Sequence, residues 1–188
     1  ALGKPINVRL ALDCGWDGMA TSHNVIGEIT GSERPDEVVL IGGHLDSWDL
    51  GTGAIDDAAG IGITMAAGKL IGDLPRAPAR SIRVVAFANE EHGLSGGRGY
   101  AVAHADEIAL HQIAAESDFG AGRIYAYASS GAPQAAQADA RIAEALAPLG
   151  IGHMPGDGGP GADISVIAAN GVAWASLIAE YVGLAVGL

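Results

Sequence analysis

Residues 38–57 read VVLIGGHLDSWDLGTGAIDD, and this stretch decides the fold class. It begins with the continuous apolar run 38–41, which is typical of a strand buried on both faces of a sheet. A glycine-rich loop follows, and a helix is predicted from Asp57, a favourable N-cap, to about Ile71. A buried strand followed directly by a helix indicates an α/β domain with parallel strands.

Strands and helices continue to alternate on both sides of this stretch. Strands are predicted over residues 6–12, 24–29, 82–88, 113–116 and 172–178, and helices over 95–105, 135–146 and 163–169. Residues 156–161, rich in glycine, are predicted to form a loop. We therefore predict one three-layer α/β/α domain over residues 1–188, with a mixed, largely parallel central sheet.

The composition excludes several classes of function. The 188 residues are 49% hydrophobic and 17% charged, which favours a globular domain over a disordered chain. A formal net charge of -12 argues against a nucleic-acid partner. The single cysteine, Cys14, excludes an intrachain disulfide and a cysteine-rich zinc site. No apolar run reaches the ~18 residues of a membrane span, and residues 1–12 lack a signal-peptide pattern.

Polar residues follow the ends of three predicted core strands. They are His44 and Asp46 after the first strand, Glu90 and Glu91 after the second, and Asp118 after the third. In open α/β sheets, ligands bind beyond the carboxyl ends of the strands, so these side chains are expected at one edge of the sheet. The loop after the first strand returns Asp56 to the same edge.

One histidine nitrogen with several carboxylates is a ligand set suited to Zn²⁺, Mn²⁺ or Co²⁺. Crowded carboxylates repel one another unless cations lie between them. Two metal ions can share a bridging carboxylate and activate a water molecule, while a carboxylate outside the ligand set acts as general base. Glu90 and Glu91 could divide the roles of base and ligand. Asp46 is placed to hold the second ring nitrogen of His44.

Each of these residues also has an ordinary structural interpretation. Glu90 and Glu91 could be solvated acids near a helix N-terminus, and Asp57 could be a helix cap alone. Asp118 could be a turn residue and His44 a hydrogen-bonded loop histidine. Because all of them fall at one end of the predicted sheet, a metal site is the better interpretation of the set.

Four segments together resemble the signature of peptidase family M28, whose members are zinc metallopeptidases with two metal ions. They are GGHLDSWD (42–49), GTGAIDDAAG (51–60), FANEEHGL (87–94) and ESDFG (116–120). Their order and spacing agree across residues 20–178, and the chain is most similar to the plasma glutamate carboxypeptidase (carboxypeptidase Q) branch. The resemblance implies the zinc-peptidase fold and a zinc-dependent exopeptidase that cleaves short peptides. It also implies a secreted or periplasmic location and leaves a homodimer open.

The resemblance implies a role for each matching residue. His44 and Asp118 would hold one zinc ion, Asp56 would bridge both, Glu91 would bind the second, Glu90 would be the general base and Asp46 the partner of His44. These roles agree with those argued from the strand ends.

The chain departs from the family pattern near its C-terminus. The family supplies a final histidine ligand from a loop beyond the last core strands, and no histidine follows His153 here. We therefore expect a domain that is incomplete at both ends, with a weakened second zinc site and low activity. A catalytically impaired domain that binds metal or peptide is the alternative, and His153 is a candidate substitute ligand.

A serine hydrolase is a further alternative. Residues 93–97 match the pattern G-x-S-x-G around Ser95, and Asp118 and His153 follow in the order found in α/β-hydrolases. The nucleophile of that motif lies at the turn directly after a strand, whereas residues 90–93 separate Ser95 from the predicted strand. The spacing therefore favours the metallopeptidase.

Overall fold

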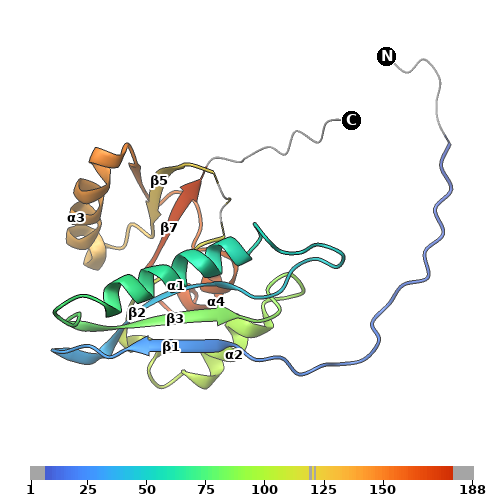
Figure 1. Cartoon of the computed structure of the whole chain (residues 1–188), viewed down its shortest axis with the longest axis horizontal. Helices are drawn as coiled ribbons and strands as arrows, with labels where there is room; N and C mark the ends of the chain where they lie inside the picture. The colour runs from blue at the N-terminus through green and yellow to red at the C-terminus, as the bar shows by residue number, and fades with distance from the viewer. Residues whose placement is uncertain (1–6, 119, 121, 180–188) are drawn as a thin grey trace, which may run out of the picture.

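A computed structural model of the chain describes residues 7–118, 120 and 122–179. Within them, seven strands form one sheet in the order β1-β3-β2-β4-β7-β5-β6 (Figure 1). The strands are β1 (Val25–Ile29), β2 (Arg34–His44), β3 (Arg80–Phe87), β4 (His111–Glu116), β5 (Ile124–Ser129), β6 (Gly152–Pro155) and β7 (Trp174–Ala179).

The central strands β3, β2, β4 and β7 are parallel to one another. Strand β1 is antiparallel to β3, and β5 is antiparallel to β7 and parallel to β6. In register, His44 of β2 lies beside Phe87 of β3, and Gly42 lies beside Glu116 of β4. The carboxyl ends of these three strands therefore meet at one edge, and the predicted mixed, largely parallel sheet is confirmed.

Helices cover both faces of the sheet (Figure 1). Helices α1 (Ala58–Gly72) and α3 (Ala136–Leu146) line a common apolar groove on one face, and α2 (Ser95–Ala103) and α4 (Ala162–Ala168) pack together on the other. In the described residues, three short 3-10 helices lie in connections: η1 (Ile108–Leu110), η2 (Pro133–Ala135) and η3 (Ala147–Leu149). The prediction of three layers is confirmed.

The main hydrophobic core lies between the sheet and the α2–α4 pair. Its buried members are Val38, Leu40, Val85, Phe87, Tyr100, Ala114, Ile164, Ile167 and Val172. Burying each of the large aliphatic or aromatic side chains stabilises the fold by about 1.5–3 kcal/mol. This core fixes the ends of β2 and β3, which carry the candidate site.

Helix α1 packs on the sheet through a row of small residues. Its buried residues are Gly60, Thr64 and Gly68, which are spaced four apart and share one face. A Cβ atom at Gly68 would lie 2.8 Å from Cγ2 of Val84 in β3. Because Gly60 and Gly68 have no side chains, the helix approaches the sheet closely, and its N-terminus lies at the edge where the strands end.

Replacing Gly60 with Ala is expected to lower the free energy of unfolding by about 3 kcal/mol. An added Cβ would overlap the main-chain carbonyl oxygen of Ser117 and the side chain of Asp57, and the carbonyl cannot rotate away. The matched control is Gly62→Ala in the same helix, because nothing lies within 4 Å of a Cβ there. That change should add about 0.5–1 kcal/mol. Urea denaturation measures both, and equal effects would contradict the close approach.

Two parts of the sequence prediction were wrong. The strand expected over residues 6–12 is not formed in its described part, residues 7–12, where Val8, Leu10 and Leu12 are exposed; residue 6 lies outside the described residues. Strands β5 and β6 were not predicted. None of the helices in the described ranges has the length and apolarity needed to cross a membrane.

Candidate metal centre

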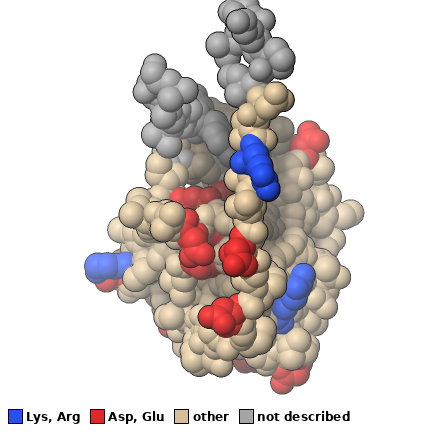
Figure 2. Space-filling view, turned by 90° about the vertical axis from the view of Figure 1, so that its right-hand side faces the viewer, with Lys and Arg blue, Asp and Glu red and all other residues tan. Residues whose placement is uncertain are grey.

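The carboxyl ends of β2, β3 and β4 carry a cluster of acidic side chains around one histidine. Figure 2 looks onto the side of the molecule where the loop 45–57 lies and shows acidic side chains gathered near the centre of this face. The end of β2 supplies His44, the loop before α1 supplies Asp56, and the segment after β4 supplies Asp118. The predicted convergence of strand ends is present in the structure.

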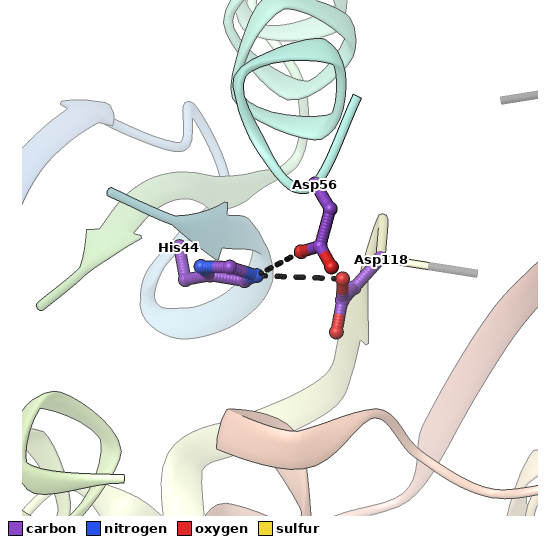
Figure 3. A group of neighbouring side chains, drawn as sticks. All are labelled: His44, Asp56 and Asp118. Atoms are coloured by element: carbon purple, nitrogen blue, oxygen red, sulfur yellow. Dashed lines mark hydrogen bonds and ion pairs between the residues drawn. The ribbon is translucent and has the colours of Figure 1, made fainter. Parts of the chain in front are cut away.

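His44 is the centre of this cluster, and only 1% of its surface is exposed. Its Nε2 atom lies 3.0 Å from Oδ1 of Asp56 and 3.4 Å from Oδ1 of Asp118 (Figure 3). The same nitrogen lies 4.0 Å from Oε2 of Glu90. Three carboxylates from three separate segments therefore face one ring nitrogen.

Two overlapping groups in this cluster have the proximity that a metal ion requires. One is His44, Asp56 and Asp118, and the other is His44, Glu90 and Glu91. In each group, one ligand atom per residue lies within 4.8 Å of the others. One imidazole nitrogen with several carboxylate oxygens fits the ligand preferences of Zn²⁺.

The protonation of His44 reflects the crowding of negative charge. Burial lowers the pKa of the imidazole, but the hydrogen bond and charge of Asp118, with the charges of Asp57 and Glu90, outweigh burial and raise it to about 10. Burial also raises the pKa values of Glu90 and Glu91. A proton is thus held where several acids converge, and a metal cation would satisfy the same carboxylates.

Asp46 joins the imidazole to the turn after β3. Its main-chain oxygen accepts a hydrogen bond of 3.0 Å from Nδ1 of His44, while its carboxylate lies 3.8 Å from that nitrogen. The carboxylate instead accepts hydrogen bonds from the main-chain N–H groups of Glu90 (2.8 Å) and Glu91 (3.1 Å). Since a carbonyl can only accept, Nδ1 carries hydrogen and Nε2 is the nitrogen available to a metal. Asp46 thus contacts His44 through its backbone carbonyl.

Asp57 fixes the end of β2 against the start of α1. One carboxylate oxygen accepts a hydrogen bond from the N–H of Gly60, which confirms the predicted N-cap, and the other accepts from the N–H of His44 at 2.9 Å. A Cβ at Gly43 would overlap the Asp57 carboxylate, so glycine is needed there. Burial raises the pKa of Asp57 to about 7. The bond to His44 was not predicted from sequence.

Two buried acids behind the cluster were also missed. Glu116 and Asp163 are 3% and 0% exposed, and each has one oxygen without a hydrogen-bond partner among the described residues. The other Asp163 oxygen accepts from the N–H of Gly97 at 3.0 Å. Burial raises the pKa of Glu116 to about 8, with the Asp163 charge adding to it, and raises that of Asp163 to about 7. Glu116 could have been singled out in the sequence, because it is an acidic residue that ends the apolar run of β4.

His153 and Ser95, on which the two alternatives depend, contact other residues in the structure. His153 stacks on Tyr127, its Nε2 lies 3.2 Å from Oγ of Ser129, and it belongs to neither metal-ligating group of the described residues. Ser95 begins α2 and accepts a hydrogen bond from Asn89. Asp118 contacts His44 instead. His153 therefore lies outside both groups, and the serine, acid and histidine of the hydrolase alternative each contact residues other than one another.

The known proteins that are similar to this chain are peptidases. The profile of peptidase family M28 matches residues 24–181. Carboxypeptidase Q of Xenopus laevis is 37% identical over 175 residues, and that of Homo sapiens is 38% identical over 176. The alignments cover 93% and 94% of this chain but 37% of each relative. The chain thus spans little more than a third of the length of these relatives.

Solved structures agree with the fold. A peptidase M28 precursor from Shewanella amazonensis superposes with a TM-score of 0.79 at 50% identity, over 84% of this chain and 36% of that one. A zinc aminopeptidase from Bacillus subtilis superposes with a TM-score of 0.65 at 20% identity, over 86% of this chain and 41% of that one. At that identity the second likeness concerns the fold alone.

Proposed function

Because the chain belongs to peptidase family M28, we propose that it forms the metal-binding part of a zinc-dependent exopeptidase that hydrolyses short peptides. The observation that carries the proposal is the convergence of four carboxylates on His44, in two groups that share this histidine. A peptide substrate and a location in the secreted or periplasmic space are proposed from the family alone.

The side chains divide into ligands and a base. His44 and Asp118 would hold one zinc ion, Asp56 would bridge, and Glu91 would bind the second. The proximity of His44, Asp56 and Asp118 supports the first site. Glu91 shares a group with His44 and Glu90, and the second site would have fewer ligands from the described residues than the first. We therefore propose that the second ion binds more weakly.

Glu90 is proposed as the general base. Bound Zn²⁺ supplies a Lewis acid that lowers the pKa of water from 15.7 to about 7. Glu90 takes a proton from the attacking water and gives it to the amine nitrogen that leaves. Burial raises the pKa of Glu90, with the charges of Asp118 and Glu91 adding to it, and a raised pKa makes the carboxylate a better acceptor of the proton from water. The carboxylate of Asp46 holds the base in place by accepting a hydrogen bond from the main-chain N–H of Glu90.

Elemental analysis of zinc-equilibrated and desalted protein tests the proposal. The parent chain should retain between about one and two zinc ions, the number set by how tightly the second is held. His44→Ala should retain close to none, because both ligand groups contain this residue. Its ring is buried, so far-UV circular dichroism should accompany the analysis to show that the variant is folded.

The matched control is His23→Ala, which removes an exposed histidine outside both groups and should leave the zinc content unchanged. A folded parent chain without zinc would overturn the metallopeptidase proposal. Zinc that is bound equally by parent and His44→Ala would show that the metal is held elsewhere. Hydrolysis of dipeptides by the zinc-loaded chain, abolished by a chelator, would then separate the exopeptidase from a domain that binds metal without turnover.

A further inference from the structure

The loop 88–94 joins β3 to α2 and carries both Glu90 and Glu91, the proposed base and the proposed ligand of the second zinc ion. Asn89 and Leu94, near its two ends, each have a φ of 58°, in the left-handed region that residues other than glycine rarely adopt. Such a backbone persists where the surrounding structure holds it. The place of the two glutamates therefore depends on the contacts that fix this loop.

Asn24, which directly precedes β1, contacts both ends of the loop. Its Oδ1 atom accepts a hydrogen bond of 3.0 Å from the N–H of Ala88, and its Nδ2 donates one of 2.9 Å to the main-chain oxygen of Gly96. The antiparallel register of β1 and β3, in which Val25 lies beside Ala86, brings Asn24 to the end of β3. One amide group, with an acceptor and a donor, thus joins the start of the loop to the start of α2.

The two ends of the loop also meet each other closely. The N–H of Gly96 donates a hydrogen bond of 2.8 Å to the main-chain oxygen of Ala88. A Cβ atom at Gly96 would overlap the backbone of Ala88 and lie 2.6 Å from Oδ1 of Asn24, so glycine is needed there. In the middle of the loop, the carboxylate of Asp46 accepts hydrogen bonds from the main-chain N–H groups of both glutamates. The loop is therefore fixed at its base by Asn24 and in its middle by Asp46.

We propose that Asn24 is a positioning residue for the peptidase site, which sets the place of Glu90 and Glu91 by joining the two ends of their loop. This inference rests on the proposed function, in which these glutamates are base and ligand. Outer contacts that orient metal ligands commonly change metal affinity or activity by 10–100-fold. A change at Asn24 should therefore weaken the second zinc site and spare the first, whose proposed ligands lie on other segments.

Two variants and one control test the bridge. Asn24→Asp keeps the size of the side chain and the acceptor for Ala88, but it places a carboxylate oxygen against the main-chain oxygen of Gly96. Asn24→Ala removes both hydrogen bonds. The control is Asn170→Asp, which makes the same change at an exposed asparagine beyond the end of α4, where the side chain donates to the main-chain oxygen of Val166 at 2.9 Å.

Hydrogen exchange of the metal-free protein measures the opening of the loop, and titration calorimetry measures zinc binding. In Asn24→Asp, the amides of residues 88–96 should exchange about tenfold faster, roughly the worth of one hydrogen bond in an opening equilibrium, while α1 exchanges as in the parent. The weaker of two zinc-binding events should lose about tenfold in affinity, and the stronger should not change. Asn24→Ala should show both effects at least as strongly, and Asn170→Asp should match the parent in both.

The contrary results are distinct from one another. Unchanged exchange of the loop, or faster exchange spread evenly over the chain, would overturn the role of Asn24 and leave the peptidase proposal standing. Faster exchange of the loop with unchanged zinc binding, or with equal loss at both zinc events, would do the same. A single zinc event in the parent would also overturn this role, because Glu91 would have no second ion to bind. A parent that binds no zinc would overturn the proposed function and this inference together.

Discussion

Glu90→Gln is expected to lower kcat for peptide hydrolysis by about 10²–10⁴-fold while zinc binding changes little. The amide keeps the size of the side chain and its main-chain hydrogen bond to Asp46, but it cannot take a proton from water. Since Glu90 is proposed as the base and not as a ligand, the zinc content should stay that of the parent. The measurement is steady-state kinetics together with elemental analysis on the same preparation.

Two comparisons make this result specific. Glu144→Gln changes an exposed acid of α3 in the same way and should leave kcat unchanged. Glu91→Gln should instead reduce zinc binding, because the amide is a poorer ligand than the carboxylate. If Glu90→Gln lost zinc and Glu91→Gln lost only turnover, the roles of the two glutamates would be exchanged. Turnover by Glu90→Gln within tenfold of the parent would exclude Glu90 as the base.

The candidate site could be predicted because its residues end buried parallel strands. Strands β2, β3 and β4 are covered on both faces and leave continuous apolar runs, so the polar residues that follow them stand out. The positions of His44, Glu90 and Asp118 at one edge then follow from the parallel arrangement. The sequence could not tell whether the carbonyl or the carboxylate of Asp46 reaches His44, because that depends on the turn geometry.

Other features depend on partners that are distant in the sequence. The alternation over residues 8–12 is the pattern of a half-exposed strand, yet no neighbouring strand pairs with it in the described residues. Strand β6 has four residues, contains Pro155 and, within the described ranges, pairs with β5 alone, so its local pattern is weak. Asp163 resembles a helix-terminal acid in sequence, and its burial depends on the packing of α4 on α2 and β4.

The buried acids give the metal-free protein an unusual dependence of stability on pH. Glu116 and Asp163 have pKa values of about 8 and about 7 in the folded chain, above the values of 4.5 and 3.8 for the free groups. Between those limits the folded state binds more protons than the unfolded state, so the free energy of unfolding falls as pH rises. For Asp163 the loss is on the order of 4 kcal/mol at most, since one pKa unit is 1.36 kcal/mol.

Asp163→Asn should therefore be more stable than the parent at pH 8 and have a shallower slope from pH 4 to pH 8. The amide carbonyl can still accept the N–H of Gly97, and the buried charge that also raises the pKa of Glu116 is gone. Urea denaturation with a chelator present measures this, because a bound cation would itself stabilise the ionised acids. Asp73→Asn, which changes a 63% exposed side chain paired with Lys69, is the control and should shift stability by less than about 1 kcal/mol. The contrary result is a parent that gains stability from pH 5 to pH 8, in parallel with Asp163→Asn. Asp163 would then be ionised at no cost, and the space behind the cluster would be far more polar than its burial implies.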